Sequence, residues 1–500
     1  MKICFFLQRR FAFVGHSIIK SLHKKNPKIE FCAYVQIRDG FDFLKKQTDV
    51  NYTSLILDED VFKRYKTEKL DLDFLKNLEQ EYGVPNAWAF IELDRIIRYG
   101  QHVREYPHDT SKYTHKEMLL LLQITAKEII KFLDKEKPDA IVFTVVGALS
   151  SRLLYAIAKK RGIPVHIIVL SRVNAQHTLT KDFKTLTYIE DLFKKIQKEK
   201  IDLPEQKQKA KEFLKNFRKN PEPYHFLDSP KTRAINRVQQ LKFLYPINFL
   251  KSLRWILLST FKFLFSKEKN DYSTIKPWHW LVDKIKQKIR ILIGYDDLYD
   301  DIDLNKNFIF FPLQLEPEIS TLLYAPFYTD QLWLAKQIAK SLPIDSLLYI
   351  KEHPTMYGKR ARSFYVELKK IPNVRLIKPS VESFGLIEKS QMIITITSTV
   401  GFEAILMKKP VITFGDIFYN ELPNTKKCKI ISDLPNIIKD QLNNFKHDED
   451  ALIDYLTAIY KESVNVDLVQ IWEVEGGGTL NKRANELEPL AKMITEKLNI

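Results

Sequence analysis

The chain has 500 residues, of which 45% are hydrophobic and 28% charged, a composition typical of folded globular proteins and not of disordered ones. Its length is too great for one ordinary domain and favours two, with room for a large insertion. Lys and Arg number 79 against 62 Asp and Glu, so the net charge of +17 excludes an acidic protein and favours a polyanionic partner: nucleic acid, anionic lipid or a phosphorylated substrate.

The cysteines and the apolar runs bear on the compartment. Cys4, Cys32 and Cys428 are too few for a disulfide framework or a zinc cluster, and they fit a reducing compartment. The first apolar run, Ile3–Leu7, is shorter than the core of a signal peptide and predicts a buried strand. No run of 18 uninterrupted apolar residues occurs, so the sequence predicts no transmembrane helix.

Residues 1–180 alternate short apolar runs with helical patterns, which predicts a Rossmann-like domain with a parallel sheet. The clearest runs are rich in β-branched residues and begin after Pro138 and Pro164, and the helix between them ends at Gly162. The predicted strands are Lys2–Leu7, Glu30–Gln36, Ser54–Leu57, Ala140–Val146 and Val165–Leu170, and the predicted helix is Leu149–Arg161.

Residues 181–300 are rich in lysine and poor in strand patterns, and they predict a basic helical insertion. Residues 231–290 hold 14 Lys and Arg against 3 Asp and Glu, a net charge of +11. Within them, 247–265 predicts a helix with a basic face opposite a face of Phe, Leu, Ile and Trp, a pattern typical of helices that lie in a membrane interface. A helix packed on a neighbouring domain, with a solvated basic face, is the alternative.

Residues 301–480 return to alternating strands and helices and predict a second Rossmann-like domain. A terminal helix is predicted over residues 481–500, after the three glycines at 476–478. The predicted strands are Phe308–Phe311, Ser346–Glu352, Val374–Ile377, Met392–Thr397 and Val411–Phe414, with a helix at Asp330–Ser341.

The sharpest candidate site follows the strand that ends at Thr397. Ser398 or Thr399 stands where a helix cap belongs, and the free N–H groups of a helix start favour phosphate. Gly401 in the first turn lets a ligand approach the backbone closely, and Glu403 can accept hydrogen bonds from ribose hydroxyls. An ordinary cap on a buried strand–helix unit is the alternative.

Two further segments place polar residues at the carboxyl ends of strands, where open α/β sheets bind ligands. His353 precedes a proline, which forces it into an extended conformation, and Lys351 makes the region electropositive. Gln314 and Glu316 follow the first strand of the second half. A structural turn at His353 and a helix start after Glu316 are the plain alternatives. The convergence of three segments on one sheet edge favours a ligand-binding site at that edge.

These motifs carry a family resemblance. The sequence KEHP at 351–354, followed by TSTVGFEAILMKKPVITFG at 397–415, resembles the capsule polysaccharide biosynthesis glycosyltransferases. These include β-Kdo transferases and, more distantly, bacterial sialyl- and polysialyltransferases. PLQLEPE at 312–318 and EYGVPNAW at 81–88 are similar too. The likeness spans roughly 305–420, is patchy over 1–180 and is absent from 181–300. It implies a GT-B architecture, in which two Rossmann-like domains face a cleft and the terminal helix crosses back to the first.

The resemblance also implies roles for single residues. His353 would meet the donor phosphate and assist the leaving nucleotide, while Ser398 and Thr399 would bind the same phosphate. The acidic base motif of the sialyltransferases is not matched: Arg38-Asp39-Gly40 holds one acid and also fits a plain turn. Asp94 is the other candidate base, or half of a helical ion pair. Arg172 follows a strand and is a candidate for binding acceptor or donor charge.

No metal site and no cofactor are predicted. Asp58-Glu59-Asp60, Asp71-Leu72-Asp73 and Asp301-Ile302-Asp303 are interpreted as solvated surface, and the 11 histidines form no zinc-binding pair. The sequence thus predicts an inverting, metal-independent glycosyltransferase, with a CMP-sugar donor favoured by resemblance alone. Its acceptor would be a growing surface or capsular polysaccharide that is linked to a lipid.

The predicted location is the cytoplasm, peripheral on the anionic inner face of the plasma membrane through residues 247–265. Nucleic acid is disfavoured as a partner because the aromatic residues of that segment form a continuous apolar face. The alternatives are a CDP-polyol phosphotransferase of the teichoic-acid type, a UDP-sugar epimerase in the same two-domain frame, and a non-catalytic scaffold.

Overall fold

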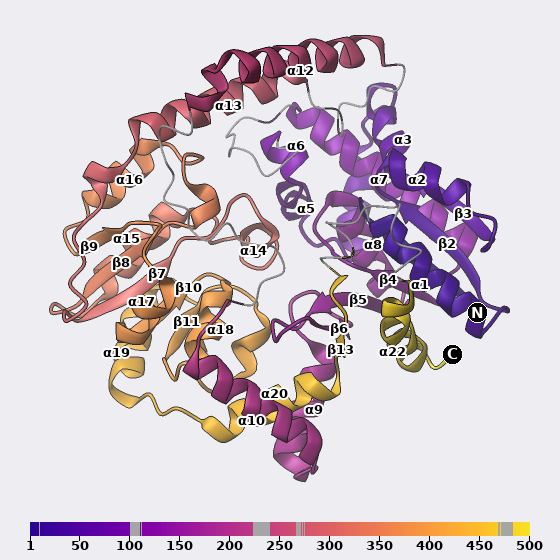
Figure 1. Cartoon of the computed structure of the whole chain (residues 1–500). Coiled ribbons are helices and arrows are strands. Elements are labelled where there is room, and N and C mark those ends of the chain that lie inside the picture. Colours follow the sequence, from indigo (N-terminus) through magenta and orange to yellow (C-terminus); the bar gives the residue numbers. More distant parts are fainter. Residues whose placement is uncertain are drawn as a thin grey trace.

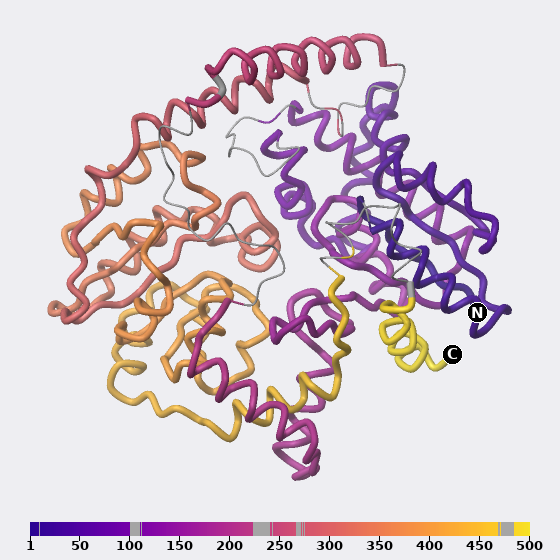
Figure 2. Tube along the Cα trace, viewed as in Figure 1, coloured from indigo at the N-terminus to yellow at the C-terminus, as the bar shows by residue number. Residues whose placement is uncertain are grey.

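The computed structural model shows two α/β domains side by side, with a pair of long helices along one edge of the molecule (Figure 1). It describes residues 1–9, 11–100, 111, 113–223, 241–266, 272, 274, 276–468, 471 and 484–500. The predicted glycine run at 476–478 lies outside these residues. The chain trace in Figure 2 places both termini on the N-terminal domain.

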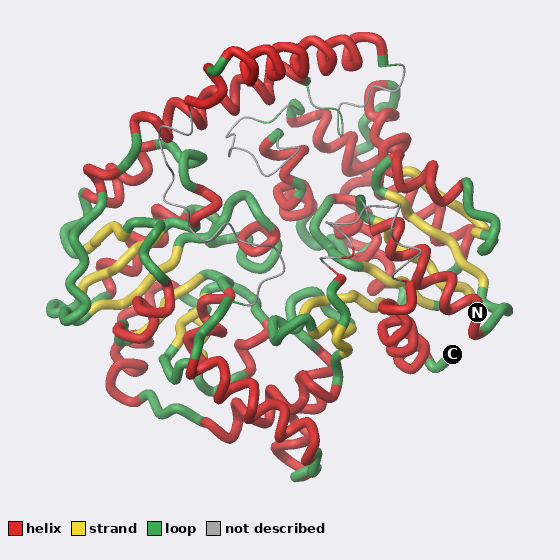
Figure 3. The backbone as a smooth tube through the Cα atoms, in the orientation of Figure 1, coloured by secondary structure: helices red, strands yellow, loops and turns green. Residues whose placement is uncertain are grey.

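A seven-stranded sheet forms the centre of the N-terminal domain, in the order β13-β6-β5-β4-β1-β2-β3. Its pairing is parallel from β5 to β3, whereas β6 is antiparallel to β5, and β13 to β6. Helices cover both faces, which is why its central strands are continuous apolar runs (Figure 3). The strands are β1 (Lys2–Leu7), β2 (Glu30–Val35), β3 (Tyr52–Leu57), β4 (Ala140–Phe143), β5 (Val165–Leu170), β6 (Gln176–Thr180) and β13 (Val464–Asn465).

The helices of this domain begin at residues suited to that place. Thr114 and Glu117 form a reciprocal capping box at the start of the longest one, and Asp71 and Asn86 cap two others. The helices are α1 (Phe11–Lys25), α2 (Arg38–Lys45), α3 (Asp58–Lys63), α4 (Leu72–Glu81), α5 (Ala87–Leu93), α6 (Arg95–Tyr99), α7 (His115–Glu136) and α8 (Leu149–Lys160).

The C-terminal domain has an all-parallel sheet of six strands in the order β12-β11-β10-β7-β8-β9. Its strands are β7 (Phe308–Pro312), β8 (Leu347–Lys351), β9 (Val374–Ile377), β10 (Met392–Thr395), β11 (Val411–Thr413) and β12 (Thr425–Lys427). Its helices are α14 (Ile319–Leu322), α15 (Gln331–Ser341), α16 (Arg362–Lys369), α17 (Ser383–Lys389), α18 (Thr399–Leu406), α19 (Leu434–Asn444) and α20 (Glu449–Lys461).

The segment predicted as one insertion divides into two parts. Helices α9 (Thr187–Glu199) and α10 (Pro204–Lys219) pack on α20, and the guanidinium of Arg218 donates to both carboxylate oxygens of Glu449 at 2.5 and 2.8 Å. The second part holds α12 (Pro246–Phe265) and α13 (Pro277–Ile293), which pack on each other. None of the 20 residues of α12 is buried. The last helix, α22 (Glu488–Leu498), packs on α1 in the N-terminal domain.

The two domains touch beside the carboxyl ends of their sheets. Lys184 pairs with Asp416 at 2.9 Å, and the rings of Phe183 and Tyr324 stack with their centroids 6.5 Å apart. The side chain of Ile319 fills the space beside Gly147, which leaves no room there for a larger residue. The predicted class, two Rossmann-like domains facing a cleft with a basic helical insertion, is confirmed.

Two local interpretations are corrected by the structure. Arg38-Asp39-Gly40 is the first turn of α2 and not a free turn, because Gly40 packs closely against Ala12 of α1. Two of the three acids that follow β3 are not solvated surface: Asp58 is fully buried and Glu59 is 9% exposed, whereas Asp60 is exposed as predicted. The hydroxyls of Ser150 and Tyr34 donate to the Asp58 carboxylate at 2.6 and 3.2 Å, which makes its burial possible.

Candidate active site

Three predicted motifs meet at the carboxyl edge of the C-terminal sheet. Strand β7 lies between β8 and β10, so the segments that follow these three strands are neighbours at that edge. They carry His353 after β8, Gln314 after β7 and Ser398 after β10. Adjacent strands are about 4.8 Å apart, so the first and last of these residues follow strands roughly 10 Å apart.

The start of α18 is a capped helix N-terminus beside a cavity. Ser398 is the cap, and its hydroxyl accepts from the backbone N–H of Val400 at 3.2 Å. Thr399 is the first residue of the helix and lines a cavity. The structure gives Gly401 a different role from the predicted one, because the Tyr419 hydroxyl occupies the space that a side chain would need there. That hydroxyl donates to the carbonyl of Ser398 at 2.6 Å and holds the turn in place.

Glu403 is the most unusual group at this edge. It is 8% exposed and faces the cavity, yet among the described residues its carboxylate has no hydrogen-bond or ion-pair partner. Burial, reinforced by Glu382, raises its pKa to about 7. Lys351 is also buried, and its ammonium donates to the Ser383 hydroxyl at 2.6 Å. Burial lowers the pKa of Lys351 to about 8, against the opposing charges of Glu382 and Glu403.

His353 projects from the end of β8 and is exposed. Its Nδ1 accepts from the backbone N–H of Thr355 at 3.2 Å, so in the neutral ring the proton resides on Nε2. The backbone N–H of His353 donates to the Glu352 carboxylate at 2.7 Å. The ring therefore presents a donor nitrogen at the sheet edge.

A buried ionic network supports the loop that carries this histidine. Arg360, 2% exposed, donates from Nε to Glu352 at 2.7 Å, pairs with Glu316, and donates to the Gln314 carbonyl at 2.7 Å. The Tyr365 hydroxyl completes the set by donating to Glu352 at 2.8 Å. Gln314 and Glu316 thus lie beneath the predicted site and position it.

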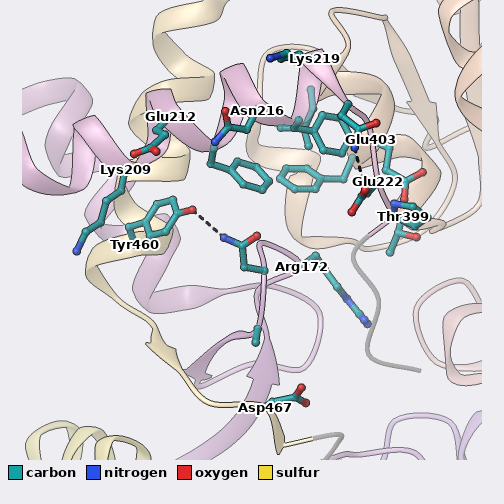
Figure 4. A pocket seen from close by; sticks show the side chains of 18 residues that line it. Arg172, Lys209, Glu212, Asn216, Lys219, Glu222, Thr399, Glu403, Tyr460 and Asp467 are labelled. Atoms are coloured by element: carbon teal, nitrogen blue, oxygen red, sulfur yellow. Dashed lines mark hydrogen bonds between the residues drawn. The ribbon is translucent and has the colours of Figure 1, made fainter. Parts of the chain in front are cut away.

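A cavity of about 830 Å³ lies between the two domains beside α18 (Figure 4). It brings together Arg172, Thr399 and Glu403, three residues that sequence reasoning singled out. Its volume is typical of sites for small organic ligands. Helix α10 supplies a wall that no motif indicated, since its polar residues look like an ordinary solvated face. The other polar and aromatic residues of the cavity are Asn174, Lys209, Glu212, Phe213, Asn216, Phe217, Lys219, Asn220, Glu222, Phe402, Tyr460 and Asp467.

Arg172 also lines a second cavity, of about 260 Å³, on the N-terminal side. Thr144 and Val145, which follow β4, line it from one domain, and Tyr324 and Ile417 line it from the other. Arg172 therefore stands where the two cavities adjoin, at the carboxyl end of β5.

The two candidate bases are not brought to the large cavity. Asp39 is exposed at the start of α2, and β2 is three strands away from β5. Asp94 is 2% exposed and caps α6: one carboxylate oxygen accepts from Ile96 and Ile97, the other from the backbone N–H of Leu149 and the hydroxyl of Tyr272. The carboxylate of Asp94 is thus already fully engaged.

The other side of the cavity does offer an acid. Asp467, which follows β13, lines the cavity and lies apart from Thr399 and Glu403 in Figure 4. Sequence reasoning missed it because it belongs to no motif and follows a strand of only two residues.

Two findings on the described part of the chain concern metal ligands and membrane-spanning helices. There, no group of three or more His, Cys, Asp or Glu is placed to hold a metal ion. No described helix combines the length and apolarity needed to cross a membrane.

Comparison with known proteins finds a family match over the C-terminal motifs. Residues 259–429 match the family described as "Capsule polysaccharide biosynthesis protein". The resemblance predicted over roughly 305–420 is confirmed, and the prediction that it is absent from 181–300 is wrong for residues 259–300. Protein FixF of Sinorhizobium fredii (strain NBRC 101917 / NGR234) is 32% identical over 125 residues, which are 24% of this chain and 30% of FixF. The match thus spans less than a third of that relative.

Solved structures with similar folds have low sequence identity. The β-Kdo 2,7 transferase KpsC of Thermosulfurimonas dismutans matches with a TM-score of 0.37 and 13% identity, over 73% of this chain and 89% of KpsC. The UDP-GlcNAc 2-epimerase of Methanocaldococcus jannaschii, in complex with UDP-GlcNAc and UDP, matches with a TM-score of 0.28 and 16% identity, over 94% and 99%. Such values do not distinguish between activities.

Proposed function

Because residues 259–429 belong to the capsule polysaccharide biosynthesis family, we propose that this chain is a glycosyltransferase. It would transfer a sugar from a nucleotide-sugar to a growing surface or capsular polysaccharide, with inversion and without a metal ion. One observation carries the proposal: a buried, unpartnered carboxylate, Glu403, shares a cavity with Thr399 at the start of α18, at the edge that also carries His353.

The donor would lie along α18. Its phosphate would take the hydroxyl of Thr399 and the first free N–H groups of the helix, which carry the positive end of the helix dipole. Glu403 follows one turn later, roughly 6 Å along the helix axis, where the ribose of a nucleotide would reach it. A carboxylate that accepts from two ribose hydroxyls would gain there the partners that it lacks in the protein.

The reaction would be a single displacement at the anomeric carbon. The acceptor oxygen forms the new bond from one face as the bond from that carbon to the phosphate oxygen breaks on the other. The leaving electron pair would stay on the phosphate oxygen, where Nε2–H of His353 and the start of α18 stabilise it.

A carboxylate would take the proton of the acceptor hydroxyl. Asp39 and Asp94 are the bases predicted from sequence, and Asp467 is the acid that faces the large cavity from the N-terminal side. Replacing each by asparagine and measuring kcat separates them: the base variant loses kcat by orders of magnitude while still binding the donor nucleotide.

Nucleotide binding tests the donor site. We would follow thermal unfolding of the wild type, His353→Ala and Glu403→Gln with CMP, CDP, UDP, GDP or ADP, since a ligand of the native state raises Tm. Stabilisation by CMP that both variants lose supports the proposal. Stabilisation by CDP alone would favour the polyol phosphotransferase, and by UDP alone a UDP-sugar enzyme. If no nucleotide stabilises the folded wild type, the proposal fails and a scaffold role is favoured.

We also place the enzyme in the cytoplasm, on the inner face of the plasma membrane. Helix α12 supports this: Leu250, Leu257 and Phe261 are 60–62% exposed, and Arg254 and Lys262 interrupt the apolar surface. A basic residue near an anionic bilayer contributes about 1 kcal/mol. An acceptor glycan carried on a lipid would then be held at the same surface as the enzyme.

A further inference from the structure

Helix α13 carries a second exposed apolar face, which was not predicted from the sequence, and the ring of its Trp278 also contacts Phe263 of α12. Its exposed apolar residues recur at intervals of three and four, so they share one side of the helix. They are Trp278 (45% exposed), Val282 (47%), Ile285 (47%), Ile289 (50%) and Ile293 (63%). The ring of Trp280 contacts that of Trp255 on α12, with centroids 4.3 Å apart, so the two helices form one unit. We call α12 and α13 together the helix pair.

One end of the helix pair is fixed to the N-terminal domain. Tyr272, which precedes α13, is 4% exposed, and its ring stacks on Phe62 with centroids 4.2 Å apart. Its hydroxyl donates to the carboxylate of Asp94 at 2.7 Å. Asp94 in turn accepts from the first N–H of α8, so Tyr272 is joined to the helix that follows β4.

The other end is fixed to the C-terminal domain. Arg290 donates to the carbonyl of Lys359 at 2.6 Å, and the buried side chain of Ile291 fills the space beside Gly358. The Tyr295 hydroxyl donates to the carbonyl of Arg360 at 3.1 Å. Their partners Gly358, Lys359 and Arg360 belong to the loop that begins at His353. Helix α13, about 25 Å long, therefore connects the capping carboxylate of one domain with the histidine loop of the other (Figure 1).

The charges of the helix pair indicate what covers its apolar surface. Lys251, Arg254 and Lys262 on α12 and Lys286 on α13 lie among the exposed Leu, Ile, Phe and Trp side chains. Basic residues beside a broad apolar face match a bilayer with anionic headgroups, where the rings and aliphatic chains enter the acyl region and the cations meet the phosphates. The helix pair runs along one outer edge of the molecule, where a bilayer can reach it (Figure 1).

We propose that both helices of the pair bind one anionic bilayer, and that this contact sets the separation of the two domains because the pair is fixed to each of them. The bilayer would thus bring the segment around Asp94 and the His353 loop to their working distance. This inference rests on the proposed membrane-bound glycosyltransferase, but it concerns the distance between the two domains and not the rate of sugar transfer.

The test measures the distance between the domains. Spin labels on Lys76→Cys and Ile344→Cys report it, because both sites are exposed and the three native cysteines are buried. The protein would be measured alone, with neutral phosphatidylcholine vesicles, and with vesicles holding 30% phosphatidylglycerol. We expect the anionic vesicles alone to bind the protein and to narrow the distance distribution at least twofold.

Two variants separate binding from coupling. Tyr272→Ala is expected to bind anionic vesicles as the wild type does but to keep its broad distribution, whereas Tyr272→Phe, which retains the ring, keeps most of the narrowing. Ile285→Glu with Ile289→Glu is expected to lose vesicle binding at least tenfold while keeping the circular dichroism spectrum of the wild type.

Three outcomes would overturn the inference. Failure of the wild type to sediment with anionic vesicles removes its premise. If anionic vesicles narrow the distance distribution of Tyr272→Ala as much as that of the wild type, the contact at Tyr272 does not couple the membrane to the domain separation. The third outcome is that the wild type binds no vesicles but self-associates in solution, and that the double glutamate variant does not. The apolar surface would then bind a second copy of the chain. Since none of these readouts needs turnover, an inactive protein that still shows the narrowing would refute the proposed activity and not this inference.

Discussion

Replacing Glu403 by glutamine should stabilise the ligand-free protein at alkaline pH and abolish its response to nucleotide. Burial raises the pKa of this carboxyl from 4.5 to about 7. The folded protein therefore holds the proton more tightly than the unfolded chain, and stability falls as the pH rises from about 4.5 to about 7. Each pKa unit corresponds to about 1.4 kcal/mol, so the ionised carboxylate costs about 3 kcal/mol at pH 8.

Glutamine has nearly the same shape and no charge, so the variant avoids this cost. Its free energy of unfolding should equal that of the wild type near pH 4.5 and exceed it by about 3 kcal/mol at pH 8. Urea unfolding of both proteins at the two pH values measures the difference, in which groups common to both cancel. Glu388→Gln, at an exposed position of the same domain, is the matched control and should change the free energy by less than about 0.5 kcal/mol.

The ligand response provides the second half of the test. If Glu403 accepts from ribose hydroxyls, the glutamine variant should lose most of the nucleotide-induced rise in Tm even though it starts from a higher value. A variant that is less stable than the wild type at pH 8 would show that the carboxylate has a favourable partner in the protein. A variant that still responds fully to nucleotide would remove Glu403 from the donor site.

Three further outcomes are expected. Arg360→Ala leaves the buried Glu352 without its charge partner and should cost about 3–5 kcal/mol of unfolding free energy, measured by urea denaturation; a loss below 1 kcal/mol would contradict the network. Gly401→Ala should be destabilised by the Tyr419 hydroxyl and partly rescued by adding Tyr419→Phe, whereas no rescue would mean that the ring of residue 419, and not its hydroxyl, causes the clash. Vesicle binding should weaken at least tenfold between 50 and 500 mM NaCl in sedimentation, because salt screens the basic residues of α12; a salt-independent interaction would assign binding to apolar contact alone.

Much of the architecture follows from the sequence because buried parallel strands have a local signature. The runs at Val165–Leu170 and Val374–Ile377 have the predicted boundaries, since both faces of each strand are covered and most of their residues are apolar and buried. The strands β6 and β12 were not predicted from the sequence, because they lie toward the sheet edges and contain Thr, His and Lys.

The sequence does not show how deeply a given side chain is buried. Asp58 looks like any exposed acid, and only the tertiary fold places the hydroxyls of Ser150 and Tyr34 on it and raises its pKa to about 8 by burial. The same limit applies to Glu403. Its position in the motif suggested a contact with a ligand, but neither its burial nor its lack of a partner could be predicted from the sequence. The wall that α10 adds to the cavity is set by how α10 packs on α20, far along the chain.

Two of the connections between the domains lie side by side, at β6 and β13. After β6 the chain leaves the N-terminal sheet for α9 and α10, and it returns after α20 to add β13 to that sheet beside β6. In topological terms the C-terminal domain is an insert within the N-terminal one, entered and left at neighbouring strands. Two such connections side by side would favour rotation about an axis close to β6 and β13, whereas the helix pair joins the two domains elsewhere. Rotation about such an axis moves residues near it very little, so Asp467, just past β13, would stay in place while the far edge of the cleft swings through the largest arc.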